Sequence, residues 1–236
     1  MLLLNKMKMQ KEKYIVFDSG SLINFTSNGL IDLFRKLKAE FNGEFLITNE
    51  IKHEVVDHPI NVQRFEWGAL RIKELLDEGI FKIAEKGFVN GNEMKRRARK
   101  IMHAANSSFI ARGRAVHLID EGEAEILAVA QIFEEQKKQA YVVIDERTAR
   151  VLCEAPMNLQ KLLKKKLHTD VRMNKDNFNL FRRCKVIRST ELAFVAYKKG
   201  FIKVKDKKAL EALIYALKFG GCSISEKEVI AYKGMR

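Results

Sequence analysis

Four short apolar runs in the first two thirds of the chain predict strands. The runs at residues 14–17, 44–47 and 139–144 are almost continuously hydrophobic, which is typical of strands that are buried on both faces. A weaker alternation of apolar and polar residues at 80–84 predicts a fourth strand. These runs are separated by longer segments, so their neighbours in the sheet are expected to be joined by crossover connections rather than by tight hairpins.

Helical periodicity fills the segments between the predicted strands. Helices are expected over residues 30–41 and 65–77, and a third begins at Asp120 and is apolar on almost all sides from 126 to 133, which indicates a buried helix. Strands that alternate with helices favour an α/β fold with a parallel or mostly parallel central sheet covered by helices, a Rossmann-like arrangement in three layers.

The composition changes after Pro156, where the chain becomes strongly basic, and it returns to helical periodicity near residue 189. Four parts are therefore expected: an N-terminal extension at 1–12, an α/β domain at 13–155 that includes a basic helical segment at 93–114, a basic insertion or arm at 156–188, and C-terminal helices at 189–236 that complete the domain.

Acidic side chains follow the predicted strands. Asp18 and Asp145 come directly after the apolar runs that end at 17 and 144, and Glu123 lies in the first turn of the buried helix. Glu54 lies on a helix that Thr48 can cap. The carboxyl ends of parallel strands and the starts of the helices that follow them meet at one edge of the sheet, so these acids are expected to share one crevice.

Carboxylates held together without a counter-charge raise one another's pKa values, and a hard divalent cation resolves the repulsion. A bound cation of this kind supports phosphodiester hydrolysis. Each acid also has an ordinary structural interpretation. Asp18 could cap a turn, Asp120 and Glu123 have the spacing of a capping box, Asp145 could form a local ion pair and Glu54 could be solvated.

The charge balance narrows the class of partner. The chain carries 44 lysines and arginines against 30 acids, a formal charge of +14, which favours nucleic acid over a merely solvated basic surface because the excess is concentrated in two stretches. The residues of the first stretch that are expected to contact a phosphate backbone are Arg96, Arg97, Arg99, Lys100, Arg112 and Arg114.

Other features exclude several classes of protein. Three widely spaced cysteines argue for reduced thiols, and the apolar start is too short for a signal peptide or a membrane helix, so a soluble cytoplasmic protein without membrane association is expected. His53 and His58 are five residues apart and would lie on different faces of an α-helix, which argues against a zinc-protease helix. The chain has no phosphate-binding loop or nucleophile-elbow motif.

Four segments resemble the motifs of PIN-domain ribonucleases, in particular the prokaryotic members with a GEAE signature. They are DSGSLINF at 18–25, TNEIKHEV at 48–55, DEGEAEILAVA at 120–130 and VIDERTAR at 143–150. The resemblance covers most of residues 13–153 and resumes at 189–202 and 220–232. The basic stretches at 93–114 and 156–188 are longer than a minimal domain of this family needs.

The resemblance implies a PIN fold, endonuclease activity on single-stranded RNA that depends on Mg²⁺ or Mn²⁺, and often a homodimer. It assigns both metal binding and catalysis to Asp18, Glu54, Glu123 and Asp145. Ser19, Thr48 and Arg147 would position the metal-binding acids or the substrate. Two choices stay open, between Glu123 and Glu125 and between Asp145 and Glu146, with the first of each pair preferred.

Two alternatives to a free-standing nuclease remain. One is a non-catalytic RNA-binding or assembly factor that keeps the fold and uses its positive charge. The other is a toxin held by a protein antitoxin, which the sequence does not decide.

Overall fold

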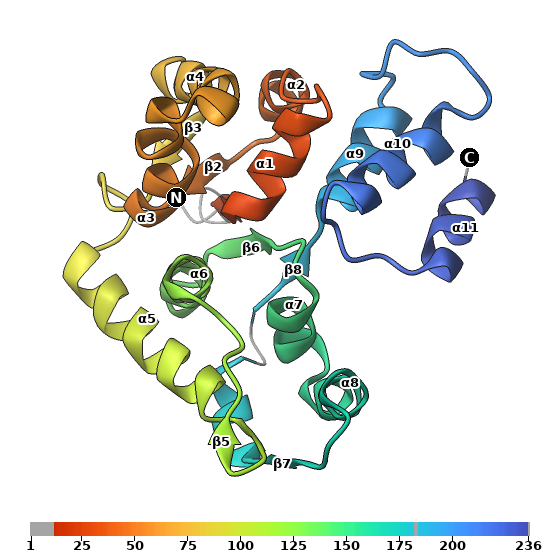
Figure 1. Ribbon diagram of the computed structural model, residues 1–236. Coiled ribbons are helices and arrows are strands. Elements are labelled where there is room, and N and C mark those ends of the chain that lie inside the picture. Colours follow the sequence, from red (N-terminus) through yellow and green to blue (C-terminus); the bar gives the residue numbers. More distant parts are fainter. Residues whose placement is uncertain (1–11, 182–183, 236) are drawn as a thin grey trace, which may run out of the picture.

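The computed structural model describes residues 12–181 and 184–235, with the side chain of Lys233 left out (Figure 1). Most of the expected N-terminal extension therefore lies outside the described residues. The architecture is α/β, with a central parallel sheet between layers of helices, as the alternation of strands and helices predicted.

The central sheet has five strands in the order β3-β2-β1-β6-β8, and every pairing in it is parallel. Its strands are β1 (Lys13–Phe17), β2 (Glu44–Ile47), β3 (Phe81–Ile83), β6 (Gln139–Val143) and β8 (Val186–Ile187). Four of the five were predicted. The edge strand β8 was not, because two residues give no periodicity and its identity as a strand comes from pairing with Val142 and Val143 of β6.

Helices cover both faces of this sheet, and Figure 1 shows α5, α6 and α7 on one side with α1, α2 and α4 on the other. The helices of this part are α1 (Ser19–Ser27), α2 (Leu33–Glu40), α3 (Asn49–Lys52), η1 (His53–Asp57), η2 (Pro59–Asn61), α4 (Gln63–Asp77), α5 (Gly91–Asn106), α6 (Glu121–Glu135) and α7 (Arg147–Glu154). The α6 helix is buried from Gly122 to Ala130, which confirms the prediction from its apolar pattern.

A second, three-stranded antiparallel sheet unites the two basic stretches. It is formed by β5-β4-β7, beside α8 and a 3₁₀ segment. The bounds are β4 (Phe109–Ala111), β5 (Arg114–Ala115), α8 (Pro156–Leu167), β7 (Val171–Met173) and η3 (Lys175–Leu180). Because β7 pairs with β4, the stretch at 156–188 is joined to the stretch at 93–114 by backbone hydrogen bonds.

The first basic stretch is helical only as far as Asn106, whereas a helical segment to residue 114 was expected. Ser107 and Ser108 end the helix by donating their hydroxyls to the backbone carbonyls of His103 and Ala104, at 2.7 and 2.6 Å. Arg112 and Gly113 then adopt positive φ angles of 50° and 77°, which turn β4 back into β5. The arginines that a helix would have aligned along one face lie instead on a helix and on a hairpin.

The C-terminal part consists of α9 (Ser189–Lys198), α10 (Ala209–Phe219) and α11 (Glu226–Gly234), and all three helices were predicted. They share a small apolar core of their own, made of Leu210, Ile214, Ile224, Val229 and Tyr232. This part joins the central domain through α1, because the side-chain amide of Asn24 donates to the carbonyl of Leu217 at 2.9 Å.

The segment that carries Glu54 is a π-helix, which changes one geometric expectation. In η1 the N–H of His58 donates to the carbonyl of His53, a five-residue step, at 3.0 Å. The two imidazole rings therefore lie on the same side, with centroids 6.3 Å apart. The prediction that they occupy different faces is wrong because it assumed α-helical geometry. Single π turns occur often at functional sites.

Two further expectations concern cysteines and membranes. Cys153, Cys184 and Cys222 are free thiols, although the Cys153 and Cys184 side chains are close enough to hydrogen-bond. No helix in the described part of the chain is both long and apolar enough to span a bilayer.

The contact between α10 and α1 leaves no room for a side chain at Gly220. A β-carbon at this position would collide with Oδ1 of Asn24 and lie 2.8 Å from Nδ2 of Asn28. We expect Gly220→Ala to lower the free energy of unfolding by about 1–3 kcal/mol, as overpacking does. Urea denaturation followed by circular dichroism measures the change.

Gly234→Ala is the matched control, because nothing lies within 4 Å of a β-carbon there. We expect this helical substitution to stabilise the protein by about 0.5–1 kcal/mol, from helix propensity alone. Equal effects of the two substitutions would contradict the tight contact between α10 and α1.

Candidate functional site

Asp18 lies where β1 ends and α1 begins. Its side chain caps α1 by accepting the N–H of Gly20 on Oδ2 at 3.2 Å, so the structural role considered from the sequence is present. The residue is 7% exposed. The backbone N–H of Ser19 also hydrogen-bonds this carboxylate, and a carboxylate with two such partners still has capacity for a further ligand.

Asp120 and Glu123 form a capping box at the start of α6, as their spacing predicted. The N–H of Glu123 donates to Oδ1 of Asp120 at 2.9 Å, and the N–H of Asp120 donates to Oε2 of Glu123 at 3.1 Å. The box does not remove Glu123 from the site, because Asp18 is the charge that acts on Glu123 most strongly. The structural and the functional interpretations of this residue are therefore compatible.

Glu54 reaches the same place from the π-helix η1. A β-carbon at Gly122 would lie 3.0 Å from Oε1 of Glu54 and 3.7 Å from Oδ1 of Asp120. The missing side chain at position 122 therefore gives the Glu54 carboxylate its space beside the start of α6. The side chain of Ser19 hydrogen-bonds Glu54. Ser19 thus orients an acid of the cluster, although the acid is Glu54 rather than Asp18.

Asp18, Glu54, Asp120 and Glu123 form a group of carboxylates that we call the acid cluster. Burial and repulsion raise the pKa values of three of them, Asp18, Glu54 and Glu123. Burial, followed by the charge of Asp120, raises the pKa of Asp18 to about 7. Burial, followed by the charge of Asp18, raises the pKa of Glu123 to about 8. Burial also raises the pKa of Glu54, against the lowering effect of Ser19. Three of the four predicted acids therefore interact, and Asp120 joins them.

Asp145, the fourth predicted acid, is engaged elsewhere. Its Oδ1 accepts the N–H of Ser189 at 2.8 Å and its Oδ2 accepts the amide of Asn24 at 2.9 Å, so the buried carboxylate joins β6 to α1 and α9. The adjacent Glu146 caps α7 through the N–H of Ala149, and its charge raises the pKa of Glu123. Of this pair, Glu146 is the acid whose charge acts on the cluster.

Glu125 and Thr48 lie beside the cluster rather than in it. Thr48 is fully buried and caps α3 by accepting the N–H of Ile51 at 3.3 Å. Its side chain also hydrogen-bonds Glu125, on which the charge of Glu85 acts. Of the two glutamates left open by the sequence, Glu123 is the one that meets Asp18. Arg147 is exposed at the start of α7, directly after Glu146.

The six predicted RNA-binding residues divide into two kinds. Arg97 is held by ion pairs with Glu93 at 2.7 Å and Glu135 at 2.6 Å, so it braces α5 against α6. The other five are exposed: Arg96, Arg99 and Lys100 on α5, and Arg112 and Arg114 on the β4–β5 hairpin. Within residues 12–181 and 184–235, Arg99, Lys100, Arg112 and Arg114 form no ion pair.

The donor set of the acid cluster suits a hard cation, since it consists of carboxylate oxygens alone. Among the described residues, no group of three or more histidine, cysteine, aspartate or glutamate side chains is placed so that it could hold a metal ion as it stands. Mg²⁺ requires only one or two carboxylates, with water and substrate oxygens as its other ligands. The buried carboxylate of Asp18, whose hydrogen-bond partners are backbone N–H groups, suits such an ion.

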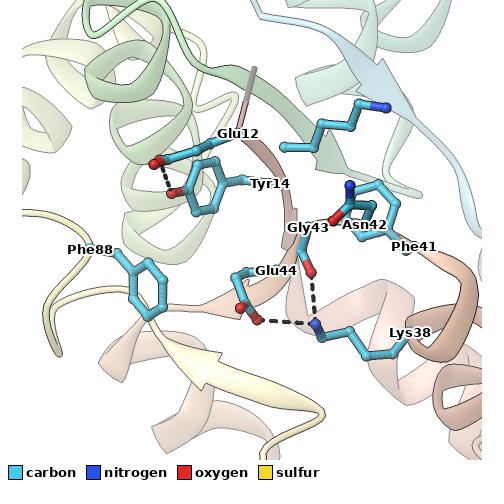
Figure 2. A pocket seen from close by; sticks show the side chains of 9 residues that line it. Glu12, Tyr14, Lys38, Phe41, Asn42, Gly43, Glu44 and Phe88 are labelled. Carbon is cyan, nitrogen blue, oxygen red and sulfur yellow. Dashed lines mark hydrogen bonds and ion pairs between the residues drawn. The ribbon is translucent and has the colours of Figure 1, made fainter. Parts of the chain in front are cut away.

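A hollow lies at the opposite end of the strands, where β1 and β2 begin (Figure 2). It measures about 610 Å³ and is lined by Tyr14, Lys38, Glu44 and Phe88, among others. Glu44 pairs there with Lys38 at 3.1 Å and with Lys82 at 3.0 Å. Its charge is thus compensated within the protein, unlike those of the acid cluster.

Comparisons with protein-family models, with curated proteins and with solved structures gave no match to this chain.

The raised pKa values of Asp18 and Glu123 predict how stability depends on pH in the absence of a cation. Both acids keep a proton in the folded state that the unfolded chain releases near its ordinary pKa of about 4. The stability that these two acids contribute is therefore fully present below about pH 4. It is lost as the pH rises through their folded-state pKa values of about 7 and 8. Thermal denaturation in EDTA between pH 5 and pH 9 measures the loss.

The double variant Asp18→Asn, Glu123→Gln removes both titrations, and we expect its melting temperature to fall less over that pH range. A wild-type melting temperature that rises from pH 5 to pH 9 would show that the acids are not held together as described.

Proposed function

We propose that this protein is a metal-dependent endoribonuclease that hydrolyses phosphodiester bonds in single-stranded RNA. The observation that carries the proposal is the acid cluster, in which Asp18, Glu54 and Glu123 from three separate elements meet at the carboxyl end of a parallel sheet. Stability alone does not favour this arrangement, because each acid makes the ionisation of the others less favourable. Acids whose ionisation is made unfavourable in this way are common at functional sites.

In this proposal the chain holds a divalent cation, Mg²⁺ or Mn²⁺, with Asp18 and Glu123, while Glu54 completes the ligand set directly or through water. When bound, the cation lowers the pKa of water and stabilises negative charge on phosphate oxygens. The chain's own residues set the geometry. Ser19 orients Glu54, the Asp120 box fixes the backbone of Glu123, and Gly122 leaves room for the Glu54 carboxylate.

Asp145 has a positioning role in this proposal. Its carboxylate binds Asn24 on α1 and the backbone of Ser189 on α9. The α1 helix begins beside Asp18, so Asp145 fixes the helix that places the first acid. Glu146 supplies the additional negative charge at the cluster.

The RNA strand is held by exposed cations on α5 and on the β4–β5 hairpin. Arg99, Lys100, Arg112 and Arg114 are available to phosphates because they form no ion pair in the described part of the chain. Neutralising phosphates releases condensed counterions, so binding through these residues depends steeply on salt.

Asp18→Asn tests the chemistry. We expect the variant to lose cleavage of a labelled single-stranded RNA in Mn²⁺ by at least about 100-fold, because it removes a ligand of the cation. Wild-type cleavage should stop in EDTA and return when Mn²⁺ is added. Asp170→Asn is the matched control, because Asp170 is an exposed acid whose ion-pair partner is Lys164 on the same surface.

Two results would reject the catalytic proposal. One is cleavage that persists in EDTA. The other is RNA binding without a metal-dependent product, which would favour a non-catalytic RNA-binding factor that uses the same exposed arginines and lysines.

The hairpin arginines test the binding surface separately from the chemistry. In the Asp18→Asn background, replacing Arg112 and Arg114 by alanine should reduce the slope of log K against log salt by roughly 1.4, at about 0.7 per phosphate contact on a single strand. Fluorescence anisotropy at several salt concentrations measures the slope.

Arg97→Gln is the control for this experiment. It removes the ion pairs with Glu93 and Glu135, so we expect it to lower thermal stability and leave the salt slope unchanged. A hairpin variant with the wild-type slope would place the RNA elsewhere on the protein.

A further inference from the structure

A second pair of carboxylates lies near the acid cluster, around the end of β2. Glu85 follows β3, and Glu125 lies on the second turn of α6. Consecutive residues at the end of β2 hold one oxygen of each. The N–H of Asn49 donates to Oε1 of Glu85 at 3.0 Å, and the Thr48 side chain hydrogen-bonds Glu125. Two acids from different elements therefore bind adjacent residues, Thr48 and Asn49, at the end of β2.

The second oxygen of each acid is buried without a partner. Neither Oε2 of Glu85 nor Oε2 of Glu125 forms a hydrogen bond with any described residue, and Glu125 as a whole is only 1% exposed. A buried polar atom in this state costs about 1–3 kcal/mol, and more when it carries charge. Two such atoms on neighbouring acids therefore destabilise the fold unless a ligand binds between them.

The protein does not supply the missing positive charge by direct contact. Across the described ranges 12–181 and 184–235, no lysine, arginine or histidine forms an ion pair with Glu85 or Glu125. Lys95 on α5 is close enough to act on the charge of Glu125, but it is exposed and makes no hydrogen bond with it. Glu121, four residues before Glu125 on α6, adds a further negative charge on the same side of the helix.

This pair is distinct from the acid cluster. Glu123 and Glu125 are two residues apart on α6, which is about 200° of rotation, so their side chains leave the helix in different directions. The charges that act on Glu123 are Asp18, Asp120 and Glu146, whereas those that act on Glu125 are Glu85, Lys95 and Glu121.

We propose that a divalent cation binds between Glu85 and Glu125, with the two free carboxylate oxygens as its protein ligands and water at its other positions. Two carboxylates with water match the coordination that Mg²⁺ and Mn²⁺ accept. The ion joins the ends of β2 and β3 to the start of α6. It is a structural ion beside the acid cluster, and its existence does not depend on RNA cleavage.

Mn²⁺ counting tests the site. The probe is Mn²⁺ itself, with the free ion measured by its electron paramagnetic resonance signal during titration of the full-length protein. The background is Asp18→Asn with Glu123→Gln, which disables the acid cluster. We expect this double variant to bind one Mn²⁺ ion and to melt at a higher temperature in Mn²⁺ than in EDTA.

Adding Glu125→Gln to that background should abolish both the bound ion and the rise in melting temperature. Glu85→Gln is the independent second variant, with the same expected loss. Each glutamine keeps the shape of the side chain and removes the repulsion, so we also expect both variants to be at least as stable as their parent in EDTA.

Lys95→Met tests whether the positive charge that offsets Glu125 is a bound cation or the side chain of Lys95. If the ion is the counter-charge, this variant still binds Mn²⁺. The proposal is overturned if the double variant binds no Mn²⁺, if Glu125→Gln and Glu85→Gln leave its binding unchanged, or if Lys95→Met alone lowers stability while Mn²⁺ has no effect. A wild-type protein that binds this ion but cleaves no RNA in Mn²⁺ would reject the proposed function and leave the site in place.

Discussion

Repulsion between buried carboxylates is the constraint around which this end of the sheet is organised. Asp18 is fixed by the end of β1, Glu54 by a π turn and Glu123 by its capping box, and none of these positions can relax without disturbing the elements beneath them. The hydrophobic core therefore supplies the free energy that keeps like charges together. Burial first, and then the neighbouring negative charges, raise the pKa values of Asp18 and Glu123.

The two basic stretches add a second organising feature. They are separated by more than forty residues of the α/β domain, yet β4 and β7 pair them into one sheet. Neither stretch could form a sheet alone, since β4 with β5 is only a short hairpin. Their positive charge is thus carried by a folded element attached to α5 and α8, which gives the arginines of the hairpin a fixed position relative to the domain.

Much of the fold could be predicted from the sequence because its signals are local. The apolar runs that became β1, β2 and β6 and the buried face of α6 are visible as periodicity. The strands β4, β5, β7 and β8 were missed because they are two or three residues long and are defined by their partners. Local pattern carries no information about such pairing.

The site was predicted in part for the same reason. The position after a strand singled out Asp18, the first turn of a buried helix singled out Glu123, and in the structure the charge of Asp18 acts on Glu123. The direction of a side chain depends on what surrounds it, and this is why the interaction of Asp145 with Asn24 and Ser189 could not be foreseen. The role of Asp120 was hidden behind its capping function, and the π turn at Glu54 has no signature in the sequence.

Asn24 links parts of the chain that are synthesised at very different times. Its amide bonds Asp145, 121 residues later, and the carbonyl of Leu217, 193 residues later. Contacts of such long range close slowly, because the loop entropy is lost before they form. On the ribosome, the helix that follows Asp18 cannot form all of its contacts until α10 has emerged. A nascent chain stalled before α10 would lack the Leu217 carbonyl that the Asn24 amide binds, so the final placement of α1 waits for the synthesis of α10.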